Sequence, residues 1–138
     1  MSKELTRIGV SLPGDLLTYF DRSFVNTSPY SRSDVIRNAI MRYIQYYEWM
    51  AQVKGERVGL FEMVYNPLEK GLSDSINYLL SESGDSVLLS VLVVLNKDDF
   101  LRIIIMQGEG EYLVKQVEKL MALRGIKYSK LTTINLFG

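Results

Sequence analysis

The first regular pattern in the chain is a strict alternation of polar and apolar residues over positions 6–12. A period of two is typical of a β-strand with one buried side, here the side of Ile8, Val10 and Leu12. One strand alone is not stable in water. We therefore expect this strand to pair with the same strand of a second copy of the chain, in a two-stranded antiparallel ribbon.

Two segments with helical spacing follow the predicted strand. The first covers residues 13–25, begins with Pro13 and Asp15 in its first turn, and has an apolar stripe formed by Leu16, Leu17, Phe20 and Phe24. Residues 26–30 favour a turn because Asn, Ser and Pro cluster there. The second helix begins at Ser31-Arg32-Ser33-Asp34, which is similar to a capping box, and continues to residue 53.

The second half of the chain alternates between strand and helix patterns. Strands are predicted over residues 57–65, 86–95, 100–107 and 126–134, and helices over 68–80 and 111–124. The order β-α-β-β-α-β is that of the ferredoxin-like split unit. We therefore predict an α+β protein, with a βαα domain over residues 1–53 and a ferredoxin-like βαββαβ domain over 56–138, separated at the Lys54-Gly55-Glu56 break.

Composition excludes several kinds of chemistry. The chain has no cysteine and no histidine, which excludes disulfides, thiolate or imidazole metal ligands, cysteine nucleophiles and Ser-His-Asp triads. The remaining oxygen ligands suit hard cations such as magnesium. We find no nucleophile–base pair and no phosphate-binding glycine loop, so we do not expect an enzyme.

Charge and hydropathy set the expected surroundings of the protein. The net charge is zero, so any binding to DNA must depend on local geometry rather than on bulk charge. No apolar run approaches the roughly 20 residues that a membrane span needs. No basic and apolar signal sequence opens the chain. We expect a cytoplasmic protein.

The polar side of the predicted ribbon is a candidate surface for reading base pairs. A two-stranded ribbon fits the DNA major groove. Arg7 can donate two hydrogen bonds to guanine, Ser11 can reach several base edges, and Gly9 allows the backbone to approach closely. The alternative is a solvated strand surface, but the order of ribbon and helices favours base contacts.

The start of the second helix is a candidate phosphate site. Ser31, Arg32 and Ser33 combine hydroxyl groups with the backbone N–H groups and positive dipole end of a helix. The alternative is a helix N-cap, and both roles can hold at once.

This succession of ribbon, two helices and βαββαβ domain resembles the nickel-responsive regulators, the NikR family, over nearly the whole chain. The order and spacing of several strings carry the resemblance: Arg7-Ile8-Gly9-Val10-Ser11-Leu12, Ser31-Arg32-Ser33-Asp34-Val35-Ile36-Arg37, Val64-Tyr65-Asn66, Asn96-Lys97-Asp98-Asp99-Phe100-Leu101 and Leu123-Arg124-Gly125-Ile126-Lys127. The resemblance implies a ribbon-helix-helix DNA-binding domain and a C-terminal domain of the ACT type.

The same resemblance implies a function and partners. It predicts a DNA-binding transcriptional regulator, for which we expect repression of a double-stranded DNA operator. It also predicts a homodimer formed through the ribbon and a homotetramer formed through the C-terminal domains. Lys70 falls where the family can touch the DNA backbone, and Asp34 where the family can hold a hard cation. A solvated lysine and a helix cap are the respective alternatives.

The family's nickel site uses three histidines and a cysteine. The matching positions in this chain fall near Ser81, at Leu92 and Val94, and at Phe100. None of them supplies an imidazole or a thiolate, so we expect no cofactor and no nickel binding. We expect the apolar replacements to pack as core.

Other interpretations remain open. The same architecture could sense a small molecule, such as an amino acid, at an ACT interface, or the chain could be an antitoxin-like module whose second half binds a protein. Asp98 and Asp99 could be an acid pair, but turn chemistry is favoured. The aromatic residues of the second helix favour packing over a stacking site for a ligand: Tyr43, Tyr46, Tyr47 and Trp49.

Overall fold

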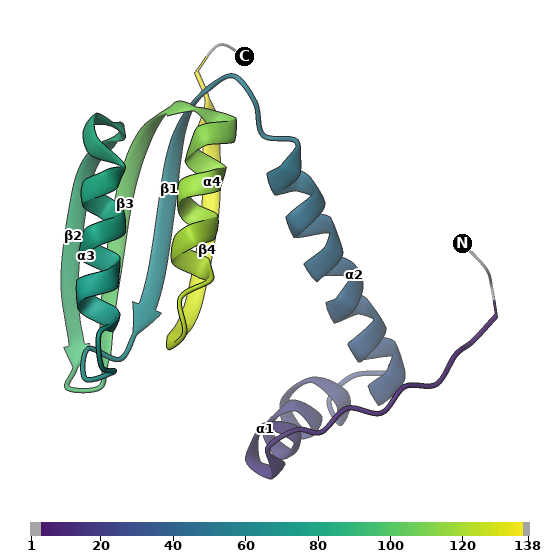
Figure 1. Ribbon diagram of the computed structural model, residues 1–138. Coiled ribbons are helices and arrows are strands. Elements are labelled where there is room, and N and C mark those ends of the chain that lie inside the picture. Colours follow the sequence, from purple (N-terminus) through teal and green to yellow (C-terminus); the bar gives the residue numbers. More distant parts are fainter. Residues whose placement is uncertain (1–3, 137–138) are drawn as a thin grey trace. The chain divides into compact units, whose positions relative to one another are not determined.

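The computed structural model describes residues 4–136 and divides the chain into two compact units, Met1–Tyr47 and Glu48–Gly138. The first unit contains α1 (Gly14–Phe20), which continues as the π-helical turn η1 (Asp21–Val25), and most of α2 (Arg32–Ala51) (Figure 1). The two predicted helices are thus present. The helical segment of α1 and η1 ends at Val25 as expected, and α2 ends two residues before the predicted residue 53.

The predicted strand at residues 6–12 is not formed within the single chain. Residues 4–12 belong to no helix or strand, and the apolar residues of this segment are exposed, with exposed fractions of 76% for Ile8 and 70% for Val10. The expected burial of the α1 stripe is also not observed, because no residue of α1 is buried. A strand needs a hydrogen-bonding partner, and no other strand is present in the described part of the first unit, residues 4–47.

The second unit has the predicted order of elements. It consists of β1 (Glu56–Tyr65), α3 (Leu72–Glu82), the short 3-10 turn η2 (Gly84–Ser86), β2 (Val87–Asn96), β3 (Asp99–Glu109), α4 (Gly110–Met121) and β4 (Ile126–Asn135). The strands form one sheet in the order β2-β3-β1-β4, and all neighbours are antiparallel. The α+β class and the βαββαβ succession are therefore confirmed.

The two helices α3 and α4 lie on the same side of this sheet (Figure 1). The strand residues that face them alternate along each strand, as the period of two requires. Register places Phe61 of β1 opposite Ile104 of β3 and Leu131 of β4, and all three are fully buried. Ile76 of α3 and Val117 of α4 complete this core without any exposed surface.

No element of the second unit covers the other side of the sheet. We call it the open side. Its apolar residues are half-buried or exposed and come from all four strands: Val58, Leu60, Val64, Leu89, Val91, Val93, Leu101, Ile103, Ile105, Tyr128 and Ile134. Glu62, Lys130 and Thr132 lie on the same side, among these apolar residues. An apolar surface of this extent is rare on a protein that acts as a monomer.

The division between the units falls inside α2. The last turn of α2 belongs to the second unit, where Met50 and Val53 are almost fully buried. The predicted domain limits, residues 1–53 and 56–138, stay a prediction. Among the described residues, no helix is long and apolar enough to cross a membrane.

Candidate functional site

The predicted base-reading residues lie on the extended segment before α1. Arg7, Gly9 and Ser11 are all exposed. A side chain added at Gly9 would meet no atom within 4 Å, so the backbone at this position is open to a large neighbour. The structure thus presents the three residues on one accessible segment, and their role in reading DNA stays a prediction.

The start of α2 has the geometry of a capping box. The backbone N–H of Asp34 donates to Ser31 Oγ at 3.2 Å, and the backbone N–H of Ser31 donates to Asp34 Oδ2 at 3.1 Å. Ser31 Oγ also donates to Asp34 Oδ2 at 2.8 Å. The other carboxylate oxygen of Asp34 accepts from Arg37 at 2.5 Å. These bonds stabilise the carboxylate and lower the pKa of Asp34, with the Ser31 hydroxyl as the largest cause.

This geometry bears on the two roles suggested for Asp34. Both of its carboxylate oxygens already accept hydrogen bonds within the first unit. Within the described residues, no group of three or more acidic side chains is placed to hold a metal ion. The cap and salt-bridge interpretation of Asp34 is therefore the one that its contacts favour.

Arg32 has a partner that sequence patterns do not indicate. Its Nε donates to Asp21 Oδ1 at 2.9 Å and its Nη2 to Asp21 Oδ2 at 2.5 Å. The bidentate pair joins η1 to the start of α2 and lowers the pKa of Asp21, mainly through the hydrogen bond from Arg32. Ser33 is exposed beside it. A phosphate bound here would share Arg32 with Asp21.

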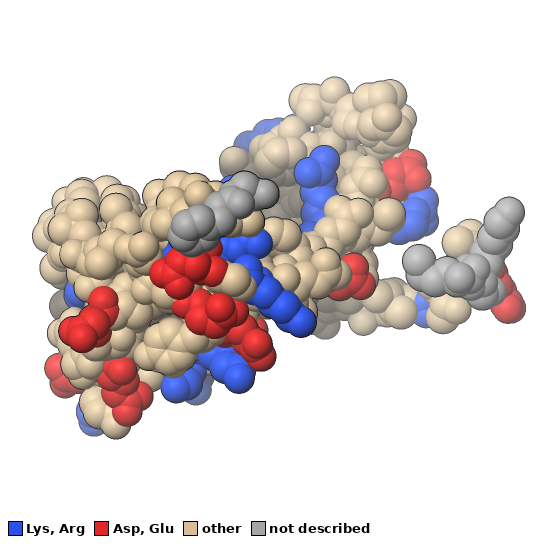
Figure 2. All heavy atoms as spheres, turned by 90° about the horizontal axis from the view of Figure 1, so that it is seen from above, with Lys and Arg blue, Asp and Glu red and all other residues tan. Residues whose placement is uncertain are grey.

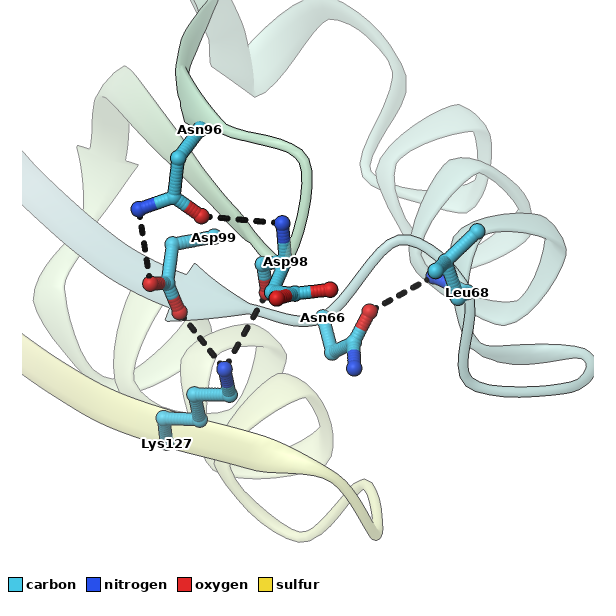
Figure 3. Close-up of polar contacts among 6 residues, drawn as sticks. All are labelled: Asn66, Leu68, Asn96, Asp98, Asp99 and Lys127. Atoms are coloured by element: carbon cyan, nitrogen blue, oxygen red, sulfur yellow. Dashed lines mark hydrogen bonds and ion pairs between the residues drawn. The ribbon is translucent and has the colours of Figure 1, made fainter.

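Lys70 lies in the second unit, in the exposed turn between β1 and α3. The turn begins at Asn66, whose side-chain oxygen accepts from the backbone N–H of Leu68 at 2.8 Å (Figure 3). This Asx turn explains why asparagine is suited to the end of β1. The suggested contact of Lys70 with the DNA backbone stays a prediction.

Asp98 and Asp99 form a turn rather than an acid pair. Asn96 Oδ1 accepts from the backbone N–H of Asp98 at 2.8 Å, and Asn96 Nδ2 donates to Asp99 Oδ2 at 3.0 Å (Figure 3). Lys127 of β4 donates to Asp99 Oδ1 at 2.6 Å and to the Asp98 carbonyl at 3.1 Å. The favoured turn interpretation agrees with this geometry.

Of the four positions that match the family's nickel ligands, Ser81 lies in α3, Leu92 and Val94 lie in β2, and Phe100 lies in β3. Ser81 Oγ donates to the Tyr78 carbonyl at 2.7 Å. Phe100 packs edge-on against Tyr65, with ring centroids 6.2 Å apart. Leu92 and Val94 are 46% and 63% exposed. The expectation that these two pack as core is wrong for the single chain, because β2 is an edge strand of the sheet.

A charged residue that sequence reasoning did not single out lies next to these positions. Arg102 of β3 is the register partner of Leu92 and points to the helix side of the sheet. Its guanidinium donates to Ser90 Oγ at 3.2 Å, Asn77 Oδ1 at 3.3 Å and Tyr65 Oη at 3.4 Å. The only sequence signal for this residue is a charge in the middle of an apolar strand.

Surface charge adds no further site on the face in view in Figure 2. Lysines and arginines lie among aspartates and glutamates there, and no broad basic surface is visible. This agrees with the net charge of zero.

The chain is an α+β protein with a split βαβ domain after a helical unit. It belongs to the NikR family: residues 58–134 match the family model of the NikR C-terminal nickel-binding domain. A "Putative nickel-responsive regulator" of Methanothrix thermoacetophila is 45% identical over 99% of this chain and 97% of its own length. A protein of the same name from Methanocella arvoryzae is 43% identical over 98% and 96%. The relatives are thus named as regulators and not as enzymes.

A solved structure supports the fold alone. An uncharacterized protein from Thermotoga maritima superposes with a TM-score of 0.53 at 18% identity. The match covers 59% of this chain and all of that protein.

These comparisons overturn one expectation. We expected no cofactor and no nickel, but the matching family model is a nickel-binding domain and the relatives are named nickel-responsive regulators. Nickel is therefore the ligand to expect. The prediction considered only the donors in this chain, whereas the family model and the names of the relatives both point to nickel.

The residues present do not form the family's donor set. The chain has no histidine or cysteine, and Leu92, Val94 and Phe100 have no lone pair to donate.

Proposed function

We propose that the chain is a DNA-binding transcriptional regulator that represses its target. The observation that carries the proposal is the exposed apolar surface of the first unit, in a member of a family of regulators. Ile8, Val10, Leu16 and Phe24 are each more than half exposed. Pairing of residues 6–12 from two chains would form the missing ribbon and cover this surface.

The paired segments would present Arg7, Gly9 and Ser11 to the major groove, with two copies of each residue in the dimer. Ser31, Arg32, Ser33 and Lys70 would contact phosphates and set the orientation of the protein on the duplex. Arg7 supplies the sequence specificity, because a guanidinium can pair with both acceptors of a guanine. The dimer then reads a half-site.

The C-terminal domains would join two such dimers. The open side of the sheet is apolar over all four strands, and its burial between copies would remove that surface from water. The proposed assembly is a homotetramer in the cytoplasm, with ribbon dimers reading the two half-sites of an operator. A folded second unit also argues against an antitoxin-like module, which usually binds through a disordered tail.

The test is a DNA footprint on the region upstream of the gene for this chain. The full chain is used, with and without a nickel salt, because nickel is the ligand that the family leads us to expect. We expect two protected half-sites separated by whole turns of the duplex. The protein concentration should be high enough for a typical regulator to occupy its operator fully. Absence of protection both with and without nickel would then contradict the proposal.

A further inference from the structure

Arg102 is a cation without a counter-charge. Among the described residues, the ion pairs involve other cations: Arg32, Arg37, Lys115 and Lys127. All three acceptors around Arg102 are neutral, and their distances of 3.2–3.4 Å lie at the long end of the hydrogen-bond range. Its Nε is buried and has no hydrogen-bond partner in the described part of the chain. A half-buried charge in this state is costly.

The groups around Arg102 are short of acceptors as well. Ser90 and Tyr65 accept from the guanidinium, and their own hydroxyl hydrogens meet no acceptor among the described residues. Asn77 also accepts from Arg102 through its side-chain oxygen, and its amide N–H groups likewise meet no acceptor among the described residues. Four side chains therefore bring donors to one place, and no carboxylate of the described residues forms an ion pair with Arg102. Such a cluster is complementary to an oxyanion.

The cluster is accessible from solvent. Asn77 of α3 and Ser90 of β2 are exposed, and Leu92, next to Arg102 in the register, is 46% exposed. Tyr65 is fully buried and closes the inner end. The donors are therefore fixed by the sheet and by α3, and a small ligand can reach them along the outer edge of β2.

We propose that Arg102, Asn77 and Ser90 form a binding site for a small oxyanion, the carboxylate or phosphate group of a metabolite. The guanidinium supplies the charge, and the Ser90 hydroxyl and the Asn77 amide supply neutral donors. The inference does not rest on DNA binding, because the site lies within the second unit and can be tested without DNA.

The first test is thermal unfolding of the full chain with sodium phosphate or sodium succinate, against sodium chloride at equal ionic strength. At a ligand concentration ten times its Kd, we expect Tm to rise by about 3–6 °C. The anion that gives the larger shift identifies the preferred group. No shift beyond that in chloride with either anion would overturn the proposal.

Arg102→Gln should abolish this shift, and Arg124→Gln, which removes an exposed arginine from the turn after α4, should leave it unchanged. An equal shift in Arg102→Gln and in the unchanged chain would mean that the anions bind elsewhere.

A second variant keeps the proposal testable if Arg102→Gln folds poorly. Asn77→Asp places a carboxylate where the Asn77 side-chain oxygen now lies, 3.3 Å from the Arg102 guanidinium. We expect it to raise Tm without added anion and to remove the response to phosphate and succinate. The rise in Tm should disappear in the double variant with Arg102→Gln. An Asn77→Asp variant that still responds fully to the anions would contradict the site.

Discussion

At the scale of single residues, the corner between β2 and β3 shows how a sequence motif becomes structure. Asp99 accepts from both Lys127 and Asn96. These hydrogen bonds hold the pKa of Asp99 below its usual value, and the hydrogen bond from Lys127 has the larger effect. The lowered pKa means that the charged form is stabilised by folding, so this contribution is present above the unfolded pKa and is lost as the pH falls through the folded pKa.

We therefore predict that Lys127→Met makes the protein less stable at neutral pH and less sensitive to acid. The variant loses the partner that lowers the pKa of Asp99, so its stability should differ most from that of the unchanged chain at neutral pH and least at strongly acidic pH. Urea unfolding over a pH series measures this. A difference that does not change with pH would mean that the ion pair is not its source.

Among the described glycines, Gly110 has the least space for a side chain. Its N–H donates to the Gly55 carbonyl at 2.7 Å, and an added Cβ would lie 2.7 Å from Val53 Cγ1 and 3.2 Å from the Lys54 backbone nitrogen. We predict that Gly110→Ala destabilises the second unit by about 1–3 kcal/mol through overpacking. Gly14→Ala is the control, because nothing lies within 4 Å of its added Cβ. Equal urea midpoints for the two variants would refute the clash.

At the scale of elements, periodicity alone predicts almost the whole second unit. Each predicted strand and helix there is present, because strand sides and helix stripes both follow from burial against one core. The segment at residues 6–12 behaves differently. Its alternation indicates a strand, but pairing is a property of two strands, and the single chain provides one. Sequence can therefore indicate the strand without showing its partner.

The start of α2 gives a prediction at this scale. Ser31→Ala removes the hydroxyl that accepts from the Asp34 N–H and donates to its carboxylate. We expect a loss of about 1 kcal/mol in the free energy of unfolding, the usual cost of losing an N-cap. Ser33→Ala is the control, because Ser33 is exposed and lies two residues further along the chain. Denaturation followed by circular dichroism measures both, and equal losses would contradict the cap.

At the scale of the whole molecule, the proposed tetramer depends on the open side of the sheet. Leu60 lies on this side in the central strand β1 and is 37% exposed. We predict that Leu60→Glu converts the tetramer to a dimer, because a carboxylate would be buried without a partner. Tyr112→Glu, at a residue of α4 with 40% exposure, should leave the tetramer intact. Light scattering gives both masses, and a monomeric unchanged chain would end the proposal.

Some features of the candidate sites could be predicted from the sequence, and others could not. The turn at Asp98 and the cap at Ser31 could be predicted because both depend on neighbouring residues. The pairing of Arg32 with Asp21 and the donors around Arg102 could not, because they come from residues 11 to 37 positions apart. The lack of histidine and cysteine misled the expectation about nickel, because that expectation considered only the donors of this chain.

The proposed reading of DNA by the ribbon depends above all on Arg7. The measurement is the affinity of the full chain and of Arg7→Ala for the footprinted operator and for an unrelated duplex, with nickel present and the salt concentration fixed. Losing a good base contact costs about 1–3 kcal/mol, and the dimer has two. We expect Arg7→Ala to lose its preference for the operator, while Arg42→Ala on the exposed surface of α2 keeps it. Unchanged operator preference in Arg7→Ala would show that the ribbon is not the reader.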